Sequence, residues 1–147
     1  GPKEFSRGGA KSIATLLNQM SIDESEQYLH QISQDDPDLY TEVKKYFLSF
    51  DDLLEMQEHL MRTFWKNPEL DIDVLAKALK GYEQATVDHI ISFLPTRKQK
   101  MYTPITTPLS KKDSEAAQQG VVQLAKDVAK SGDLNLDDVL ADSEMIE

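Results

Sequence analysis

The sequence predicts an all-α protein, assembled as a solenoid-like stack of short helices rather than as a long bundle. Apolar residues recur three and four positions apart along nearly the whole chain, which is the spacing of one helix face. No run of useful length alternates apolar and polar residues, so we expect no β-strand. Start and stop signals follow one another closely, which favours about seven short helices joined by tight turns.

Four segments carry the helical spacing most clearly. Three of them place apolar residues at i, i+3, i+4 and i+7: Ile13, Leu16, Leu17 and Met20; Val87, Ile90, Ile91 and Leu94; Val121, Leu124, Ala125 and Val128. The fourth extends a similar stripe, with one polar interruption, over one helix: Leu53, Gln57, Leu60, Met61, Phe64 and Trp65. Each set predicts one buried helix face, and the two aromatic residues are expected in the core.

Capping residues indicate where these helices begin and end. Ser21 followed by Glu24 is typical of a capping box, and Asp36 followed by Pro37 is typical of an N-cap with proline at the first helical position. Two further helices are expected, one from Asp71 to a closing Gly81 and a longer one from near Ser110 to a closing Gly132.

Composition divides the chain into two helical units. Residues 21–42 carry seven carboxylates and no Lys or Arg, and the apolar stretch Phe47-Leu48-Ser49-Phe50 follows them. We therefore expect a three-helix segment over 8–46, a hinge at 47–50 and a second helical unit over 51–147. Residues 1–7 are expected to be a linker and the remnant of a cleaved tag, because the chain opens with Gly1-Pro2.

Composition and spacing argue against catalytic and metal-binding chemistry. The chain has no cysteine, which excludes disulfides, thiolate metal sites and cysteine nucleophiles, and which fits a reducing cytoplasm. Glu55 and His59, four positions apart, are better explained as an exposed ion pair than as metal ligands. No glycine-rich phosphate loop or nucleophile elbow occurs, so we expect no enzyme, no cofactor and no metal.

The overall charge and hydropathy favour a soluble cytoplasmic protein. A net charge of −10 disfavours general nucleic-acid binding, which needs a basic surface. No run approaches the roughly 18 apolar residues that a membrane-spanning helix needs.

One stretch departs from this acidic character. Thr96 to Lys112 holds five cations and two prolines but no carboxylate. Pro104 and Pro108 disfavour helix, so the helix that carries Arg97 is expected to end by about Met101. Three explanations stay open: uneven scatter of solvated charges, docking of an acidic partner, or a latch onto the acidic tail, namely Asp133, Asp137, Asp138, Asp142, Glu144 and Glu147.

Four stretches, in the same order and spacing, resemble the C-terminal portion of the FliG family of flagellar motor switch proteins. They read GGAKSIATLLNQM, DDPDLYTEVKKYFLSFDDL, VLAKALKGYEQATVDHIISFLPTR and AAQQGVVQLAKDVAKSGDLNL. The resemblance implies an armadillo-like, right-handed stack of short helices. Gly8 and Gly9 would form a linker, followed by the C-terminal armadillo segment, a hinge and a terminal helical domain.

The resemblance also implies a function. Members of the family are structural components of the rotor ring (C-ring), at the flagellar basal body on the cytoplasmic face of the inner membrane, and serve motility and chemotaxis. FliM and neighbouring FliG-type subunits are the implied partners. Torque would pass through a ridge of charges that faces the stator protein MotA.

The implied stator-facing ridge is only partly present. Lys80 and Arg97 match the family's ridge cations, and Lys111 or Lys112 is expected to supply another. Where the family carries paired aspartates, this chain reads Thr103-Pro104-Ile105-Thr106. The ridge keeps its cations and loses its anions, so we expect a weakened contact with MotA.

The expected hinge is altered as well. Ser49 stands where the family has an aliphatic residue, which is expected to loosen or re-aim the hinge. Together with the missing acids, this indicates a divergent paralogue of FliG. The alternative is a helical-repeat protein–protein interaction module unrelated to motility, whose binding would not respond to charge reversal at Lys80 or Arg97.

We predict that the chain self-associates through residues 10–46. In the family this segment stacks on another subunit's middle domain. No such domain is expected in this sequence, so the outer apolar face of the segment is expected to be left open. Analytical ultracentrifugation should show a weight-average mass that rises with concentration. A strictly monomeric profile at high concentration would contradict this prediction.

Overall fold

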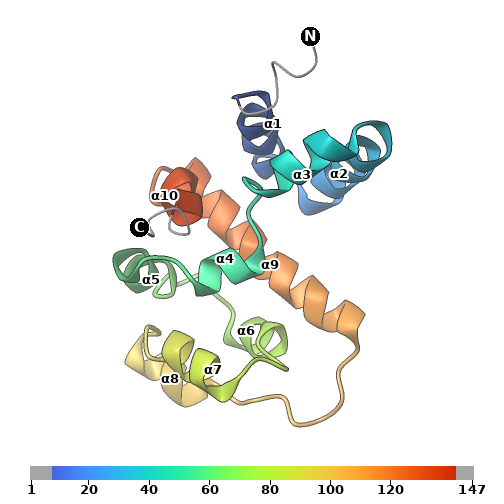
Figure 1. The fold of residues 1–147 in the computed structure, drawn as a ribbon. Helices are drawn as coiled ribbons and strands as arrows, with labels where there is room; N and C mark the ends of the chain where they lie inside the picture. The colour runs from blue at the N-terminus through green and yellow to red at the C-terminus, as the bar shows by residue number, and fades with distance from the viewer. Residues whose placement is uncertain (1–7, 142–147) are drawn as a thin grey trace. The chain divides into compact units, whose positions relative to one another are not determined.

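The computed structural model describes residues 8–141; residues 1–7, with the expected tag remnant, and residues 142–147 lie outside the described part. Within residues 8–141 all regular structure is helical, which confirms the all-α prediction (Figure 1). The ten helices are α1 (Gly8–Asn18), α2 (Ile22–Asp35), α3 (Pro37–Lys44), α4 (Phe50–Leu54), α5 (Glu58–Phe64), α6 (Ile72–Ala78), α7 (Gln84–Ile91), α8 (Thr96–Met101), α9 (Lys111–Lys130) and α10 (Leu136–Ala141). The chain forms two compact units, unit 1 up to Leu48 and unit 2 from Ser49.

The described chain holds more helices than the predicted seven, partly because one expected helix is broken. The stripe from Leu53 to Trp65 divides into α4 and α5, and Met56 is buried between them. If residues 53–65 formed one unbroken helix, their buried side chains would be spread over about half of the helix circumference. The bend at residues 55–57 lets both short helices bury their apolar faces, and it also places Glu55 and His59 on different sides of the break.

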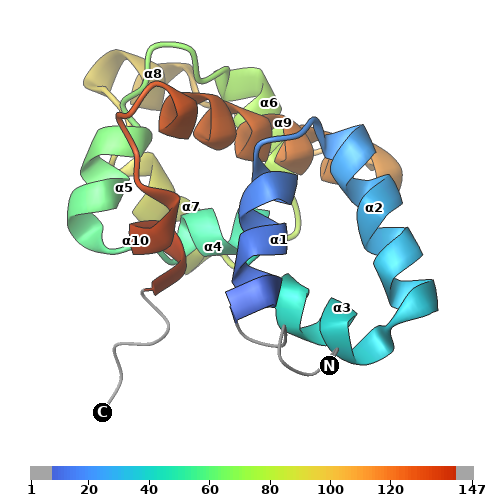
Figure 2. The same cartoon turned by 90° about the horizontal axis from the view of Figure 1, so that it is seen from above.

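In unit 1, α3 returns the chain from the end of α2 to α1 (Figure 2). The core consists of small and branched apolar residues, namely Ala10, Ala14, Leu17, Leu29 and Val43. The buried face of α1 therefore differs from the predicted stripe, because Leu16 is 59% exposed while Ala10 and Ala14 are fully buried. Alanine's short side chain allows neighbouring helices to approach closely at this face.

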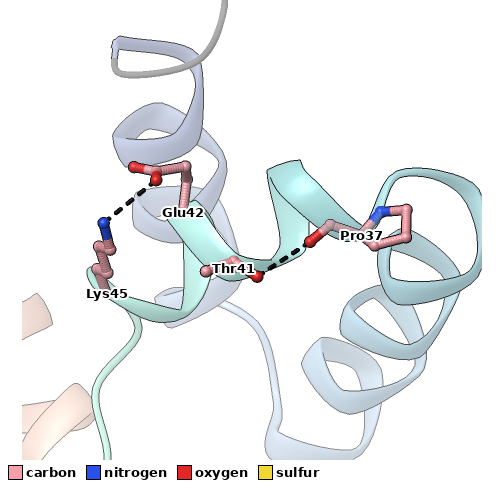
Figure 3. A network of polar contacts seen from close by, with 4 residues as sticks. All are labelled: Pro37, Thr41, Glu42 and Lys45. Atoms are coloured by element: carbon pink, nitrogen blue, oxygen red, sulfur yellow. Dashed lines mark hydrogen bonds and ion pairs between the residues drawn. The ribbon is translucent and has the colours of Figure 1, made fainter.

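The predicted caps of unit 1 are confirmed. The Ser21 hydroxyl accepts from the Glu24 amide at 3.2 Å, and the Asp36 carboxylate accepts from the Leu39 amide at 3.1 Å, with Pro37 opening α3. Figure 3 shows the exposed side of α3, where Thr41 Oγ1 donates to the Pro37 carbonyl at 3.1 Å.

Unit 1 is closed by a buried asparagine at the end of α1. Asn18 Oδ1 accepts from the buried Leu48 amide at 3.2 Å, and Asn18 Nδ2 donates to the Tyr46 carbonyl at 3.3 Å. Asn18 is only 5% exposed. One side chain thus satisfies two backbone groups of the segment by which the chain leaves unit 1.

Unit 2 is built around α9. α6 and α4 pack against α9, and α10 packs against α4 (Figure 1). The buried face of α9 repeats at helical spacing: Ala117, Val121, Val122, Ala125 and Lys126. Phe64 and Trp65 are buried with their rings edge to face at 4.9 Å, which confirms the expected core position of both.

The boundary signals of unit 2 are also confirmed. Asp71 accepts from the amides of Asp73 and Val74 at 2.8 and 3.2 Å, and Ser110 caps α9. Gly81 and Gly132 follow their helices with φ of 91° and 92°, a conformation that favours glycine.

A tyrosine joins the start of α4 to the turn between α6 and α7. Tyr82 Oη donates to Asp51 Oδ1 at 2.6 Å, and the Tyr82 ring meets Phe50 edge to face at 5.9 Å. Burial raises the pKa of Tyr82, and the hydrogen bond to the Asp51 carboxylate raises it further.

We predict that Asn18→Ala lowers the free energy of unfolding by about 1–3 kcal/mol, because the buried Leu48 amide loses its acceptor. Chemical denaturation measures the loss. Thr15→Ala on the exposed side of α1 is the control, and it should change stability by no more than about 0.5 kcal/mol. Equal stability of the two variants would show that Asn18 does not close unit 1.

We also predict an alkaline loss of stability that depends on Tyr82. The raised pKa favours the neutral phenol in the folded state, so its contribution is complete below about pH 10 and declines above that pH as the unfolded chain ionises. Denaturation midpoints measured from pH 8 to 11 should therefore fall faster for the parent than for Tyr82→Phe. Asp51→Asn should give an intermediate slope. Parallel pH profiles for parent and Tyr82→Phe would refute the prediction.

Candidate functional site

The acid-free stretch, Thr96 to Lys112, forms α8, an extended loop over residues 102–110 and the first two residues of α9. α8 ends at Met101 as predicted, and Tyr102 is extended with φ −66° and ψ 124°. Pro104 has no amide to donate and restricts Thr103, so a helix cannot continue through this point. Tyr102, Ile105 and Leu109 are half-buried, whereas both prolines and Thr103, Thr106 and Thr107 are exposed.

The structure does not gather the four predicted ridge cations into one cluster. Arg97 is on α8, and Lys111 and Lys112 open α9; all three are exposed. α8 and the first turn of α9 lie apart, at opposite ends of the 102–110 loop, in both views (Figures 1 and 2). A partner that met all these cations would have to extend along the loop.

Lys80 is used inside unit 2. Its Nζ donates to the Ile105 carbonyl at 2.9 Å, and its side chain is half-buried. The bond ties the middle of the extended loop to the segment that follows α6. That Lys80 also faces a partner stays a prediction.

Two lysines that no sequence pattern distinguishes hold α8 in place. Lys98 Nζ lies 3.2, 3.3 and 2.8 Å from the carbonyl oxygens of Asn67, Pro68 and Leu70. Lys66 Nζ donates to the Phe93 carbonyl at 2.7 Å. The only sequence signal was indirect: the segment Thr96–Met101 has a single apolar residue, Met101, and so needs some other attachment to the unit.

The start of α9 is attached to α6 in a similar way. Ser114 Oγ donates to the Lys77 carbonyl and Gln118 Nε2 to the Ala78 carbonyl, both at 3.1 Å. These carbonyls are in the last turn of α6, and that of Lys77 also accepts from the Lys80 amide at 3.4 Å. The turn that carries Lys111 and Lys112 is therefore fixed to the core of unit 2.

The proposed latch onto the acidic tail is not formed by the aspartates that the structure describes. Within residues 8–141, Asp133, Asp137 and Asp138 are exposed and form no ion pair with the cations of the acid-free stretch. The other expected members, Asp142, Glu144 and Glu147, lie outside the described residues.

The residues of the expected hinge are divided between the two units. Leu48 is buried and bonded to Asn18 in unit 1, whereas Phe50 is buried and contacts Tyr82 in unit 2. Ser49 forms a capping box with Asp52, its Oγ accepting at 3.3 Å and its amide donating at 2.9 Å. Lys44 Nζ lies 5.8 Å from the Phe47 ring centroid. That residues 47–50 act as a hinge stays a prediction.

The expected linker glycines differ from the prediction. Gly8 and Gly9 are in the first turn of α1 rather than before it. The first amides of a helix have no helical partner, so glycine costs less there than in a helix interior.

The described residues contain neither a cluster of metal ligands nor a membrane-spanning helix. Across residues 8–141 no group of three or more His, Asp or Glu side chains is arranged to hold a metal ion. None of the helices in that range combines the length and the apolar character needed to cross a membrane.

Comparison with known proteins identifies relatives of this chain. The FliG C-terminal domain model matches residues 30–136. The flagellar motor switch protein FliG of Borreliella burgdorferi is 24% identical over 132 residues, and that of Vibrio cholerae is 25% identical over 132 residues. Both alignments cover 88% of this chain but only 38% and 37% of those proteins, so the chain spans well under half of their length.

Solved structures agree on the fold. A FliG fragment from H. pylori superposes with a TM-score of 0.68 at 17% identity, covering 85% of this chain and 59% of the fragment. Full-length FliG from Aquifex aeolicus gives a TM-score of 0.50 at 24% identity, covering 84% of this chain and 39% of that one. These likenesses confirm the predicted armadillo-like helical fold. Since the domain model matches most of the described residues, the chain belongs to the FliG C-terminal domain family.

Proposed function

We propose that this chain is the C-terminal region of a rotor protein in the switch complex (C-ring) of the bacterial flagellar motor. The observation that carries the proposal is the family match over residues 30–136, which runs from α2 through the start of α10. Relatives that align with most of the chain are flagellar motor switch proteins. The chain would act at the flagellar basal body, on the cytoplasmic face of the inner membrane.

The role is structural rather than catalytic. Unit 2 presents exposed cations on α8 and α9, and both helices are attached to the rest of the unit by hydrogen bonds to backbone carbonyls. Such an arrangement transmits force from a surface contact to a packed helical core.

The partners would be FliM and neighbouring FliG-type subunits. Unit 1 exposes Leu16 and Tyr28, with 59% and 55% of their surfaces accessible. Large apolar side chains exposed on a small helical unit favour contact with another protein. The same exposure supports the self-association predicted for this segment.

A stator contact through MotA would be weak. Arg97, Lys111 and Lys112 supply exposed positive charge, but no carboxylate occurs from Thr96 to Lys112. A contact that pairs charges of both signs would keep only half of its pairs, and each exposed ion pair contributes about 0.2–1 kcal/mol. The chain is thus best explained as a divergent paralogue that joins the ring without being its main torque carrier.

We predict that the chain co-sediments with FliM from the same organism. It should bind a MotA cytoplasmic-loop fragment at least about tenfold more weakly than it binds FliM, a difference of ~1.4 kcal/mol in binding free energy. FliM binding should be unchanged in Arg97→Glu, since α8 is assigned to the stator side. Lys130→Glu, at the far end of α9, is the control for net charge.

Two outcomes would contradict the proposal. Binding to neither FliM nor the MotA fragment would remove the assignment to the switch complex. Binding of the MotA fragment as tight as that of FliM, and lost in Arg97→Glu alone, would show that the missing acids are dispensable.

A further inference from the structure

Helix α8 is not held by the hydrophobic core. None of its six residues is buried, and only Lys98 is half-buried. Its ends are better anchored, because Leu94 is buried before it and Tyr102 is half-buried after it. Between these anchors, something other than apolar packing must fix the helix.

Lys98 provides that attachment. Its ammonium group has three N–H donors, and three carbonyl oxygens lie within 2.8 to 3.3 Å of Nζ. All three belong to the turn between α5 and α6, 28 to 31 residues earlier in the chain. Bonds from a charged donor are shorter and stronger than bonds between neutral groups.

A second lysine ties the same two segments in the opposite direction. Lys66 follows α5, and its Nζ donates to the Phe93 carbonyl just before α8 at 2.7 Å. We name Lys66 and Lys98 the lysine clasp. Gln99 Nε2 donates to the Leu94 carbonyl at 2.8 Å, but this bond is local. In the described chain, Lys98 is therefore the one side chain of α8 whose hydrogen bonds reach beyond the turn that leads into this helix.

We infer that Lys98 is a positioning residue: it seats α8 on unit 2 and so sets how Arg97, Lys100 and Met101 are presented. These three residues are exposed and lie at i, i+3 and i+4, on one face of the helix. Because α8 adds nothing to the core, loss of the Lys98 bonds opens α8 while unit 2 stays folded. That the face formed by Arg97, Lys100 and Met101 meets an acidic partner is a separate step, and only that step rests on the proposed function.

The inference separates the internal lysine from the external ones. Lys98 is a structural donor and is not part of the surface offered to a partner. Of the five cations from Thr96 to Lys112, the other four are exposed: Arg97 and Lys100 on α8, and Lys111 and Lys112 at the start of α9.

Amine labelling tests the clasp directly. The full chain is treated with a limiting amount of acetic anhydride, and the modified lysines are quantified by mass spectrometry. Lys98 should react about tenfold more slowly than Lys100, since its ammonium must first leave the three carbonyls (tenfold corresponds to ~1.4 kcal/mol). Equal rates for Lys98 and Lys100 would overturn the inference.

Hydrogen exchange tests the seating of α8. The amides of Gln99 and Tyr102 donate to the Pro95 and Lys98 carbonyls at 2.9 and 3.0 Å and report opening of this helix. Lys98→Met should speed their exchange about tenfold with exchange in α6 and α9 unchanged. Lys98→Arg, which keeps charge and donors, should stay closer to the parent. Exchange of these amides within about twofold of the parent in Lys98→Met would overturn the inference.

A matched pair of variants separates positioning from charge. Lys98→Met and Lys100→Met remove the same charge from the same helix, but only Lys98→Met removes the carbonyl contacts. With poly-L-glutamate as the acidic probe, Lys98→Met should weaken binding more than Lys100→Met. Equal losses in the two variants would mean that Lys98 acts by charge alone. Failure of the MotA and FliM binding experiment leaves the labelling and exchange results unaffected, so the two proposals fail separately.

Discussion

The structure depends on how the backbone groups at the ends of its short helices are satisfied. A helix leaves its first four amides and last four carbonyls without a helical partner, so ten helices within residues 8–141 create many such groups. Asn18 bonds the Leu48 amide and the Tyr46 carbonyl in the segment between α3 and α4, where the chain leaves unit 1. In unit 2, Ser114 and Gln118 bond carbonyls of α6, and Lys66 bonds the carbonyl of Phe93. Side chains that satisfy helix ends are therefore also the ones that join neighbouring helices.

This constraint decides which cations are available to a partner. In the sequence, Lys80 and Lys98 are indistinguishable from any solvated lysine, yet each donates to backbone carbonyls and is half-buried. Arg97, Lys100 and the lysines that open α9 are exposed instead. A count of positive charges from Thr96 to Lys112 thus overstates the charge at the surface, because Lys98 is used to hold α8. Lys80, outside that stretch, holds the loop in the same way.

The sequence was sufficient wherever the determinant was local. Ser21, Asp36 and Asp71 were recognisable as caps because each bonds an amide two or three residues ahead. Pro104 likewise fixed the end of α8. The failures were non-local: Leu16 fits the apolar spacing of α1 but is exposed, because the facing helices meet the alanines instead. The contacts of Lys80 and Lys98 with carbonyls 25 to 31 residues away leave no local signal at all.

A changed outer edge is compatible with an unchanged helical frame because the two use different interactions. The frame of unit 2 is the packing of α6 and α4 on α9 and the buried aromatic pair Phe64 and Trp65. The 102–110 loop is attached to this frame by half-buried side chains, one bond from Lys80 and the Ser110 cap of α9. Substitutions in such a loop cost little stability, since most surface changes fall within about 0.5 kcal/mol. A member of this family can therefore carry prolines and no carboxylate at this edge, while the helices behind it keep the geometry that its relatives share.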